Sequence, residues 1–508
     1  MRPCLPGSSG RIAVTDVLRR ALEAADPGAT ALRDGYRSVR YGELPSLLRI
    51  EGEWLRKARI ERCALLADNG VAWAVADLAL HFGEVLALPL PASFTVTQQL
   101  HALDDAGVAT LLTDDPDYVS RELPGWRVDG IAPASGLHRL SRALSSSSIA
   151  EVPPGTRKVT YTSGSTASPK GVCLSAQTLE AVAAAVALAT AELSIERHVC
   201  LLPLATLLEN VAGLYAPLMR GATCLLPSSV ETGIDYAALD VARLLDSVSR
   251  HRPHSMILVP ELLHALVLAA ENGWGVPESL RFVAVGGARV TESLLERAEA
   301  AGIPAYEGYG LSECASVVCL NTPGARKIGT VGRPLAHVRA RVDAHGEVHV
   351  AGNGMLGYLG EAPRPAIQEC ATGDLGQFDA DGFLRLHGRA GNRFITSFGR
   401  NVSPEWIESE ISQRLGGCPV LAYGEARPWV VALVDAGNAL DDVAIERAIA
   451  AANTTLPSYA RVRHWARAPR AFSVADGTLT ANGRLRRREI HARHAASIDA
   501  LSEPALVS

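Results

Sequence analysis

Short apolar runs alternate with longer amphipathic stretches through the middle of the chain. The short runs are rich in β-branched residues, and the longer stretches repeat their apolar residues with helical spacing. We predict strands at Cys200–Leu202, Thr223–Leu226, Met256–Val259 and Phe282–Val285. We predict helices at Leu179–Leu193, Tyr236–Val248, Pro260–Ala270 and Glu292–Ala301. This alternation predicts an α/β fold with a mostly parallel sheet.

The pattern changes after Gly388. Ser403 and Pro404 supply an N-cap and a first-turn proline for a helix that we expect to end near Leu415. Strand-like runs follow at Val420–Tyr423 and Trp429–Val434. The C-terminal part is therefore predicted to be a small separate α+β module.

The composition limits the classes of function. With 508 residues, 48% of them hydrophobic and 20% charged, the chain can bury several cores. A net charge of −5 provides no basic surface for nucleic acid, so we expect a small molecule or a carrier protein as partner. Nine cysteines without metal-type spacing suit reduced thiols. Without a long charge-free apolar run or a signal-peptide pattern, we expect no integral membrane segment and a cytoplasmic location.

The densest group of candidate functional residues lies at Val159–Leu174, with the sequence VTYTSGSTASPKGVCL. A β-branched strand leads into a loop of small residues that can turn backbone N–H groups toward an anion. Lys170 adds a positive charge, and hydroxyl groups or close backbone approach come from Thr162, Ser163, Gly164, Ser165 and Thr166. Because Pro169 precedes Lys170 and Gly171 follows it, this is not a Walker loop. The residues fit a phosphate-binding loop, and taken alone they fit a Ser/Gly surface turn equally well.

Three further clusters follow along the chain. In AVGGARV, Ala284–Val290, a strand ends in two glycines that would let a flat ring lie against the backbone. In YEGYGLSECA, Tyr306–Ala315, a hydroxyl and a carboxylate form a pair of oxygen ligands suited to Mg²⁺. In TGDLGQFDADGFLRLHGRAGNRF, Thr372–Phe394, an aspartate and an arginine suit a ribose and a phosphate. Each cluster alone also fits an ordinary turn or polar loop.

In this order, and over nearly the whole chain, the clusters resemble the adenylate-forming superfamily of acyl-CoA synthetases, peptide-synthetase adenylation domains and luciferases. The runs GNRFITSFGRNVSPEWIESEI and YGEARPWVVALV are most similar to long-chain fatty acyl-CoA synthetases. The resemblance implies an AMP-binding N-terminal domain of α/β subdomains plus a small β-barrel, residues 1–391, and a small mobile α+β lid, residues 392–508.

The resemblance also implies an AMP-forming acid–thiol ligase. A carboxylate would attack the α-phosphorus of Mg²⁺-bound ATP and release pyrophosphate. A thiol would then take the acyl group as a thioester and release AMP. The thiol would belong to CoA or to the phosphopantetheine arm of an acyl carrier protein.

Several residues acquire roles from this resemblance. Lys170 and the segment Thr162 to Thr166 would hold the β- and γ-phosphates, and Thr166 and Glu313 would ligate Mg²⁺. Asp374 would bind the ribose, and Arg389 the ribose and phosphate. The rest of the nucleotide site would comprise Gly286, Gly287, Ala288, Glu307, Gly308, Tyr309, Gly310, Leu311 and Ser312. Asn392 would be the hinge, and the thiol would enter past Gly399, Arg400 and Ser403.

Arg484 departs from the family pattern. It stands, in LTANGRLRR, where most members carry the lysine that bridges the attacking carboxylate and the α-phosphate. Arginine keeps the charge but presents a planar fork instead of a compact ammonium group. Either the site is adapted to arginine, or adenylation is weak and the chain mainly binds adenylates made elsewhere. The otherwise intact nucleotide motifs favour an active enzyme.

The predicted substrate pocket contains Thr206, Asn210 and Gly213. Thr206 stands where many fatty and aryl acid ligases carry histidine. Since no aspartate occurs between Leu201 and Leu218, an amino acid is disfavoured, and we expect a fatty or other acyl or aryl acid. Glu209 is the only acid nearby, and we interpret it as a helix-surface or capping residue.

Overall fold

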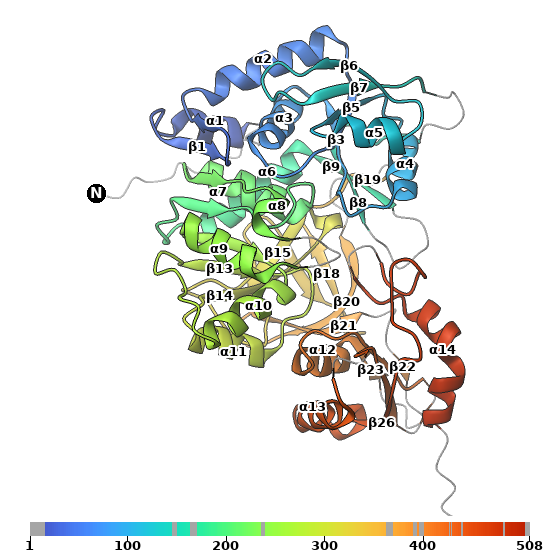
Figure 1. Ribbon diagram of the computed structural model, residues 1–508. Coiled ribbons are helices and arrows are strands. Elements are labelled where there is room, and N and C mark those ends of the chain that lie inside the picture. Colours follow the sequence, from blue (N-terminus) through green and yellow to red (C-terminus); the bar gives the residue numbers. More distant parts are fainter. Residues whose placement is uncertain are drawn as a thin grey trace, which may run out of the picture.

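The protein has a large N-terminal domain with two large sheets and a smaller C-terminal domain (Figure 1). The predicted fold class is confirmed. The computed structural model describes residues 16–144, 150–162, 170–234, 239–361, 369–389, 394–395, 401–425, 427, 429–437, 440–480 and 483–502. The predicted boundary between residues 391 and 392 lies outside these ranges.

The first large sheet has nine strands, and its central strands are parallel. Its order is β16 (Arg333–Pro334), β15 (Ser316–Leu320), β14 (Ala305–Leu311), β13 (Phe282–Val285), β12 (Ser255–Leu258), β10 (Arg197–Val199), β11 (Thr223–Leu225), β1 (Thr30–Arg33) and β2 (Ser38–Arg40). The strand predicted at Cys200–Leu202 is wrong by three residues. The side-chain amide of Asn69 donates hydrogen bonds to the carbonyl oxygens of Cys200 and Leu202, so these carbonyls do not pair with a neighbouring strand.

The second large sheet has eight strands. Its order is β19 (Gly357–Tyr358), β9 (Lys170–Ser175), β8 (Thr156–Thr162), β4 (Leu86–Pro89), β3 (Arg62–Leu66), β5 (Thr110–Thr113), β7 (His138–Ser141) and β6 (Arg127–Ile131). Strands β8 and β9 pair in antiparallel fashion, and Thr162 lies opposite Lys170. Both ends of the predicted phosphate loop are therefore anchored in this sheet.

Helices cover both sheets, and one core cluster contains residues of both sheets and of the helices between them. The helices are α1 (Val17–Ala24), α2 (Leu44–Lys57), α3 (Val71–Phe82), α4 (Val96–Asp105), α5 (Pro116–Glu122), α6 (Ala176–Ala189), α7 (Ala216–Met219), α8 (Ser229–Thr232), α9 (Val241–His251), α10 (Pro260–Glu271) and α11 (Glu292–Ala300). The four predicted helices are present as α6, α9, α10 and α11. A π-helix, η1 (Glu209–Tyr215), which the apolar pattern does not reveal, precedes α7.

A smaller antiparallel sheet has four strands, β17 (Arg339–Val342), β18 (Glu347–Ala351), β20 (Cys370–Phe378) and β21 (Leu384–Arg389). Beyond it, the C-terminal domain has its own buried core. Its elements are β22 (Phe394–Ile395), β23 (Asn401–Val402), α12 (Pro404–Arg414), β24 (Val420–Tyr423), β25 (Val430–Val434), α13 (Asp442–Thr455), β26 (Val462–Arg467) and α14 (Arg487–Ser502).

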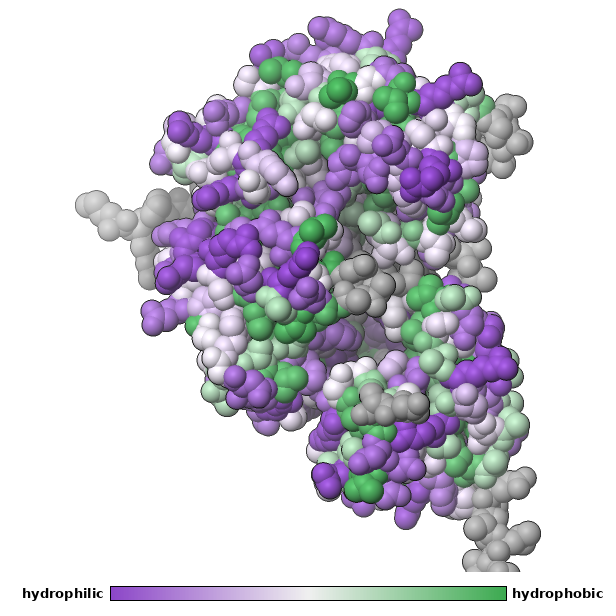
Figure 2. All heavy atoms as spheres, viewed as in Figure 1, coloured by the Kyte–Doolittle hydropathy of each residue, from purple (hydrophilic) through white to green (hydrophobic). Residues whose placement is uncertain are grey.

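Helix α12 begins at the predicted proline, but the Ser403 hydroxyl donates to Glu405 instead of capping the helix. The face in Figure 2 is hollowed between the two domains. Among the helices in the described ranges, none combines the length and the apolar composition that crossing a membrane requires.

Candidate active site

Two of the predicted nucleotide segments lie side by side at the carboxyl ends of β13 and β14. These parallel strands are in register, with Val285 opposite Glu307. The turn at Gly286 to Ala288 follows β13, and a side chain added at Gly286 would lie 3.4 Å from the carbonyl oxygen of Gly308. Gly287 has a φ of 84°, which only glycine adopts readily. Ligands bind at this edge of parallel sheets because the strand ends present free backbone groups there.

Gly310 allows β14 and β15 to approach closely. A Cβ at this position would lie 1.5 Å from the Ser316 carbonyl oxygen, so no other residue fits this backbone. The chain then turns through a short 3₁₀ helix, η2 (Ser312–Cys314), which places the half-buried Glu313 next to β19. The segment from Glu307 to Leu311 thus forms a rigid edge beside the Gly286 turn.

Asp374 joins this edge from the four-stranded sheet. Its Oδ2 accepts a hydrogen bond of 2.6 Å from the Tyr309 hydroxyl, and its Oδ1 accepts one of 2.9 Å from Arg389 Nε. Burial raises the pKa of Asp374, although both partners favour the carboxylate. The half-exposed guanidinium of Arg389 extends outward from the pair. A buried carboxylate and a cation therefore stand together, as the sequence predicts for a ribose and a phosphate.

Arg484 reaches the same place from the C-terminal domain. Its Nη2 donates a 2.7 Å hydrogen bond to the carbonyl oxygen of Gly287. Desolvation and the positive charge of Arg389 lower the pKa of Arg484, while Glu261 and Asp374 raise it. Residues far apart in sequence thus bring two guanidinium groups and a carboxylate close enough to interact electrostatically.

Lys170 and Glu313 are connected through Tyr358 on β19. The Lys170 ammonium lies 4.9 Å from the centroid of the Tyr358 ring and 3.5 Å from Glu361 Oε1. The Tyr358 hydroxyl donates a 2.9 Å hydrogen bond to Glu313 Oε1. The sequence analysis missed Tyr358 because it belongs to no motif, and only the pairing of β19 with β9 brings it here.

Several predicted residues lie outside the described residues. They are Ser163, Gly164, Ser165, Thr166, Asn392, Gly399 and Arg400. Ser403 is described and buried, at the start of α12, and Glu405 next to it accepts a 3.4 Å hydrogen bond from the Arg389 backbone N–H. The start of this helix therefore contacts Arg389.

Comparison with known proteins identifies the family. A family model described as AMP-binding enzyme matches residues 19–359, more than half of the chain. The chain belongs to the AMP-binding enzyme family. The described nucleotide-binding candidates before residue 360 lie within the matched region, whereas Asp374, Arg389 and Arg484 lie beyond it.

Two curated relatives of this AMP-binding enzyme are CoA ligases by name. Over an alignment of 541 positions, the chain is 25% identical to long-chain-fatty-acid–CoA ligase FadD15 of Mycobacterium bovis, with 87% of this chain and 88% of the relative covered. Over 371 positions it is 28% identical to a 2-succinylbenzoate–CoA ligase of Bacillus cereus, with 69% and 72% covered.

The fold of the AMP-binding enzyme also matches a solved structure. The anthranilate CoA ligase AuaEII in complex with anthranoyl-AMP superposes with a TM-score of 0.75 at 19% identity. The match covers 96% of this chain and 98% of that one. The shared fold therefore includes the C-terminal domain as well as the matched family region.

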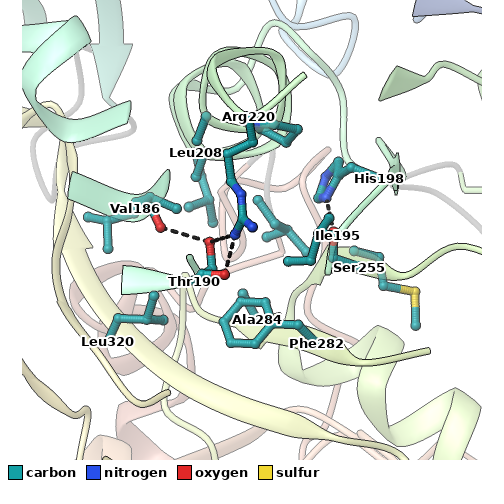
Figure 3. Close-up of a pocket in the computed structure, with 16 residues that line it drawn as sticks. Val186, Thr190, Ile195, His198, Leu208, Arg220, Ser255, Phe282, Ala284 and Leu320 are labelled. Carbon is teal, nitrogen blue, oxygen red and sulfur yellow. Dashed lines mark hydrogen bonds between the residues drawn. The ribbon is translucent and has the colours of Figure 1, made fainter. Parts of the chain in front are cut away.

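An apolar cavity of about 60 Å³ lies behind the Gly286 turn of this AMP-binding enzyme, between η1, the end of α6 and the first sheet (Figure 3). Leu208 and Ala212 line it from one side, and Phe282 and Ala284 line it from β13. The three predicted pocket residues do not line it. The Thr206 hydroxyl donates to the Pro203 carbonyl at 2.6 Å, and Gly213 packs against the Glu209 carboxylate.

Asn210 belongs to a fully buried polar cluster behind the cavity wall. Asp77 Oδ1 lies 2.7 Å from Lys158 Nζ, and Asp77 Oδ2 accepts hydrogen bonds from Asn210 and from the Tyr215 hydroxyl. Burial lowers the pKa of Lys158. Leu208 and Ala212 are four residues apart and share a face, so Asn210, halfway between them, faces away from the cavity. This cluster was not predicted.

Glu209 is fully buried, so the interpretation as a surface or capping residue is wrong. Its carboxylate lies 3.3 Å from His198 Nε2, and the other oxygen accepts the Leu202 N–H. Burial raises the pKa of Glu209. The Glu209 carboxylate therefore contacts β10 through His198 and the following turn through Leu202, and these contacts fix where η1 begins.

Glu307 is buried beside the Gly286 turn and should make stability depend on pH. Burial raises its pKa from 4.5 to about 8. Unfolded Glu307 loses its proton near pH 4.5, whereas the folded residue keeps it up to about pH 8. The free energy of unfolding should therefore fall by roughly 1.4 kcal/mol per pH unit over this interval from this residue.

Urea unfolding of the wild type and of Glu307→Gln between these two pH values tests this expectation. The variant cannot ionise at this position, so the difference in unfolding free energy between the two proteins should decline as pH rises. A difference that stays constant with pH would contradict the raised pKa.

Proposed function

We propose that this enzyme activates a carboxylic acid as its acyl-adenylate and transfers the acyl group to the thiol of coenzyme A. The observation that carries the proposal is the hydrogen bond from Arg484 to the Gly287 carbonyl. It places a cation of the C-terminal domain next to Arg389 and Asp374, where a nucleotide α-phosphate would lie. The names of the relatives support an acid–CoA ligase.

The difficulty of the first step is electrostatic, because a carboxylate must approach a polyanion. Two unit charges 4 Å apart repel by about 1 kcal/mol in water and about 4 kcal/mol near a protein surface. Arg484 and Arg389 offset this repulsion with donors that are already in place. A bond forms between the carboxylate oxygen and the α-phosphorus while the bond to the β-phosphate oxygen breaks, and pyrophosphate leaves.

The second step needs no enzyme nucleophile. The thiol of coenzyme A loses its proton and attacks the acyl carbonyl, and AMP leaves with the electron pair of the broken C–O bond. We propose that the thiol enters near Ser403, Gly399 and Arg400, with residues 1–391 and 392–508 as the two domains and Asn392 as the hinge. The separate core of the C-terminal domain supports this division.

The remaining nucleotide contacts are part of the proposal. Lys170 and the segment from Thr162 to Thr166 would bind the β- and γ-phosphates. The Gly286 turn and the edge from Glu307 to Leu311 would enclose the adenine, and Asp374 would accept the ribose hydroxyls. Glu313 fits Mg²⁺, since its half-buried carboxylate accepts a hydrogen bond from Tyr358 and has further lone pairs for a hard cation. When bound with Thr166 and Glu313, Mg²⁺ would neutralise phosphate charge.

The cavity behind the Gly286 turn favours an apolar acid. Leu208, Ala212 and Phe282 supply apolar side chains, and no aspartate from η1 enters it to hold an ammonium group. We therefore propose a fatty or aryl acid as substrate, and a cytoplasmic location remains part of the proposal.

ATP–pyrophosphate exchange over a panel of fatty, hydroxy, aromatic and amino acids tests the function. We expect exchange with apolar acids and none with amino acids, followed by thioester formation when CoA is added. If the thioester forms with an acyl carrier protein and not with CoA, the acceptor is the carrier protein. ATP-dependent thermal stabilisation without exchange for any acid would contradict the ligase and leave an adenylate-binding protein.

A further inference from the structure

The apolar cavity ends where α6 and α7 end. Thr190 directly follows α6, Arg220 directly follows α7, and both line the cavity (Figure 3). Among the described lining residues, Arg220 carries the only permanent charge. A permanently charged side chain along an apolar cavity requires a reason, because desolvating a guanidinium is unfavourable.

The Arg220 guanidinium is fixed to the C-terminal end of α6. Nη1 donates to the carbonyl oxygen and to the hydroxyl of Thr190, and Nη2 donates to the carbonyl oxygens of Ala191 at 3.2 Å and Leu193 at 2.6 Å. Carbonyls at a helix C-terminus lack partners within the helix and attract cations. With these donors used by the backbone, Arg220 is not arranged to bind a substrate carboxylate.

Arg220 also lies on the solvent side of the cavity. Arg220 is partly exposed, whereas Thr190 and Ile195, which line the cavity beside it, are buried. Burial lowers the pKa of Arg220, as expected for a side chain with one face against apolar residues. The guanidinium therefore lies at the solvent-facing end of the cavity.

The cavity is small. Its volume of about 60 Å³ compares with roughly 150 Å³ for an engineered apolar cavity that admits benzene. Strand β13 runs from the lining residues Phe282 and Ala284 to the Gly286 turn, beside which Arg484 donates to Gly287. An acid with its carboxylate near Arg484 and its tail along β13 would therefore reach the cavity and Arg220.

We propose that Arg220 sets the upper limit on the length of the acid, so that the enzyme selects acids with compact apolar tails. This inference rests on the proposed ligase function. The hydrogen bonds to α6 hold the side chain in place, and a longer tail would have to break them to pass. Arg220 is thus a specificity-determining residue at the end of the acid site, remote from the reacting atoms.

Arg220→Ala tests the proposal with a series of unbranched saturated acids, or of para-alkyl benzoates if the wild type prefers aromatic acids. We measure kcat/KM in the exchange reaction and express each value relative to the best wild-type acid. For acids beyond the wild-type limit, this ratio should rise about fourfold per added methylene, which corresponds to about 0.8 kcal/mol per buried CH₂. The KM for ATP should stay unchanged.

Arg197→Ala is the matched control. Arg197 also donates to a backbone carbonyl, that of Arg252, at 3.0 and 3.2 Å, but it does not line the cavity. Its variant should keep the wild-type length profile. Arg220→Gln shortens the side chain less and should shift the profile in the same direction, so it carries the test if the alanine variant does not fold.

The outcomes separate the two proposals. A wild type that shows no exchange with any acid would overturn the ligase function. If the wild type is active and folded Arg220 variants show the same dependence on acid length, the role of Arg220 is overturned and the ligase function stands. A profile that shifts equally in Arg197→Ala would also overturn it, because the effect would then not depend on the cavity.

Discussion

Replacing Arg484 by alanine should lower the rate of ATP–pyrophosphate exchange by about a hundredfold or more. The side chain donates to the Gly287 carbonyl and lies close enough to Arg389 for their charges to interact, so its loss removes a cationic donor from the proposed site of bond formation. Exchange measured at saturating ATP and acid reports this step. Arg484→Lys keeps the charge and should lose much less.

The conversion of added acyl-adenylate to the thioester should change less, because that step does not form a bond at phosphorus. Arg488→Ala is a suitable control, since Arg488 is an exposed arginine four residues away on α14. An exchange rate that is equal in Arg484→Ala and in the wild type would remove Arg484 from the mechanism. The enzyme would then need another source of charge for the attacking carboxylate.

Replacing Asp77 by alanine should lower the free energy of unfolding by about 3–5 kcal/mol. Lys158 is 1% exposed, and its ammonium lies 2.7 Å from Asp77 Oδ1. Without the carboxylate, a buried cation loses its counter-charge, and the Asn210 amide and Tyr215 hydroxyl lose an acceptor. Chemical denaturation with urea measures the loss.

Two controls distinguish a buried pair from an ordinary one. The double variant Asp77→Leu, Lys158→Met removes both charges and should recover most of the stability that Asp77→Ala loses. Glu53→Ala breaks the exposed pair with Arg49 on α2 and should lower the free energy of unfolding far less than Asp77→Ala does. A loss in Asp77→Ala no larger than in Glu53→Ala would show that the buried pair adds little.

The candidate nucleotide residues could be selected from the sequence because they are close together along the chain, and their role in nucleotide binding stays a prediction. Gly287, Gly310 and Glu313 occupy turns or short segments, and a few neighbouring residues are enough to indicate the backbone conformation there. Asp374 and Arg389 face each other across β20 and β21, so the two residues that one motif suggested for the nucleotide lie together in the structure. Arg484 could be placed beside them only through the resemblance to a family.

The wall of the apolar cavity could not be predicted in the same way. The segment from Glu209 to Tyr215 begins with two adjacent polar residues and continues with apolar and small ones, so periodicity does not reveal which face meets the cavity. A π-helix also changes the angle between successive residues around the helix axis, so the residues after it face other directions than in a regular α-helix. Asn210 therefore faces Asp77, while Leu208 and Ala212 line the space.

Tyr358 and Lys158 illustrate a second limit. Each acts through a partner that is far away in sequence, Glu313 for Tyr358 and Asp77 for Lys158. No local pattern distinguishes a lysine in a strand that will be buried from one that will be exposed. Such contacts become visible only when the order of strands in the sheet is known.

The order of strands in the first sheet has a consequence for the growing chain on the ribosome. Strand β1 pairs in parallel with β11, and Leu32 lies opposite Cys224. Until the chain beyond Leu225 has emerged, β1 has only its hairpin neighbour β2, and Ala31 and Leu32, which are fully buried in the finished fold, remain uncovered. Closing so long a loop is slow, so the first segment of the nascent chain must wait for the middle of the protein and is exposed to chaperones and aggregation in the interval.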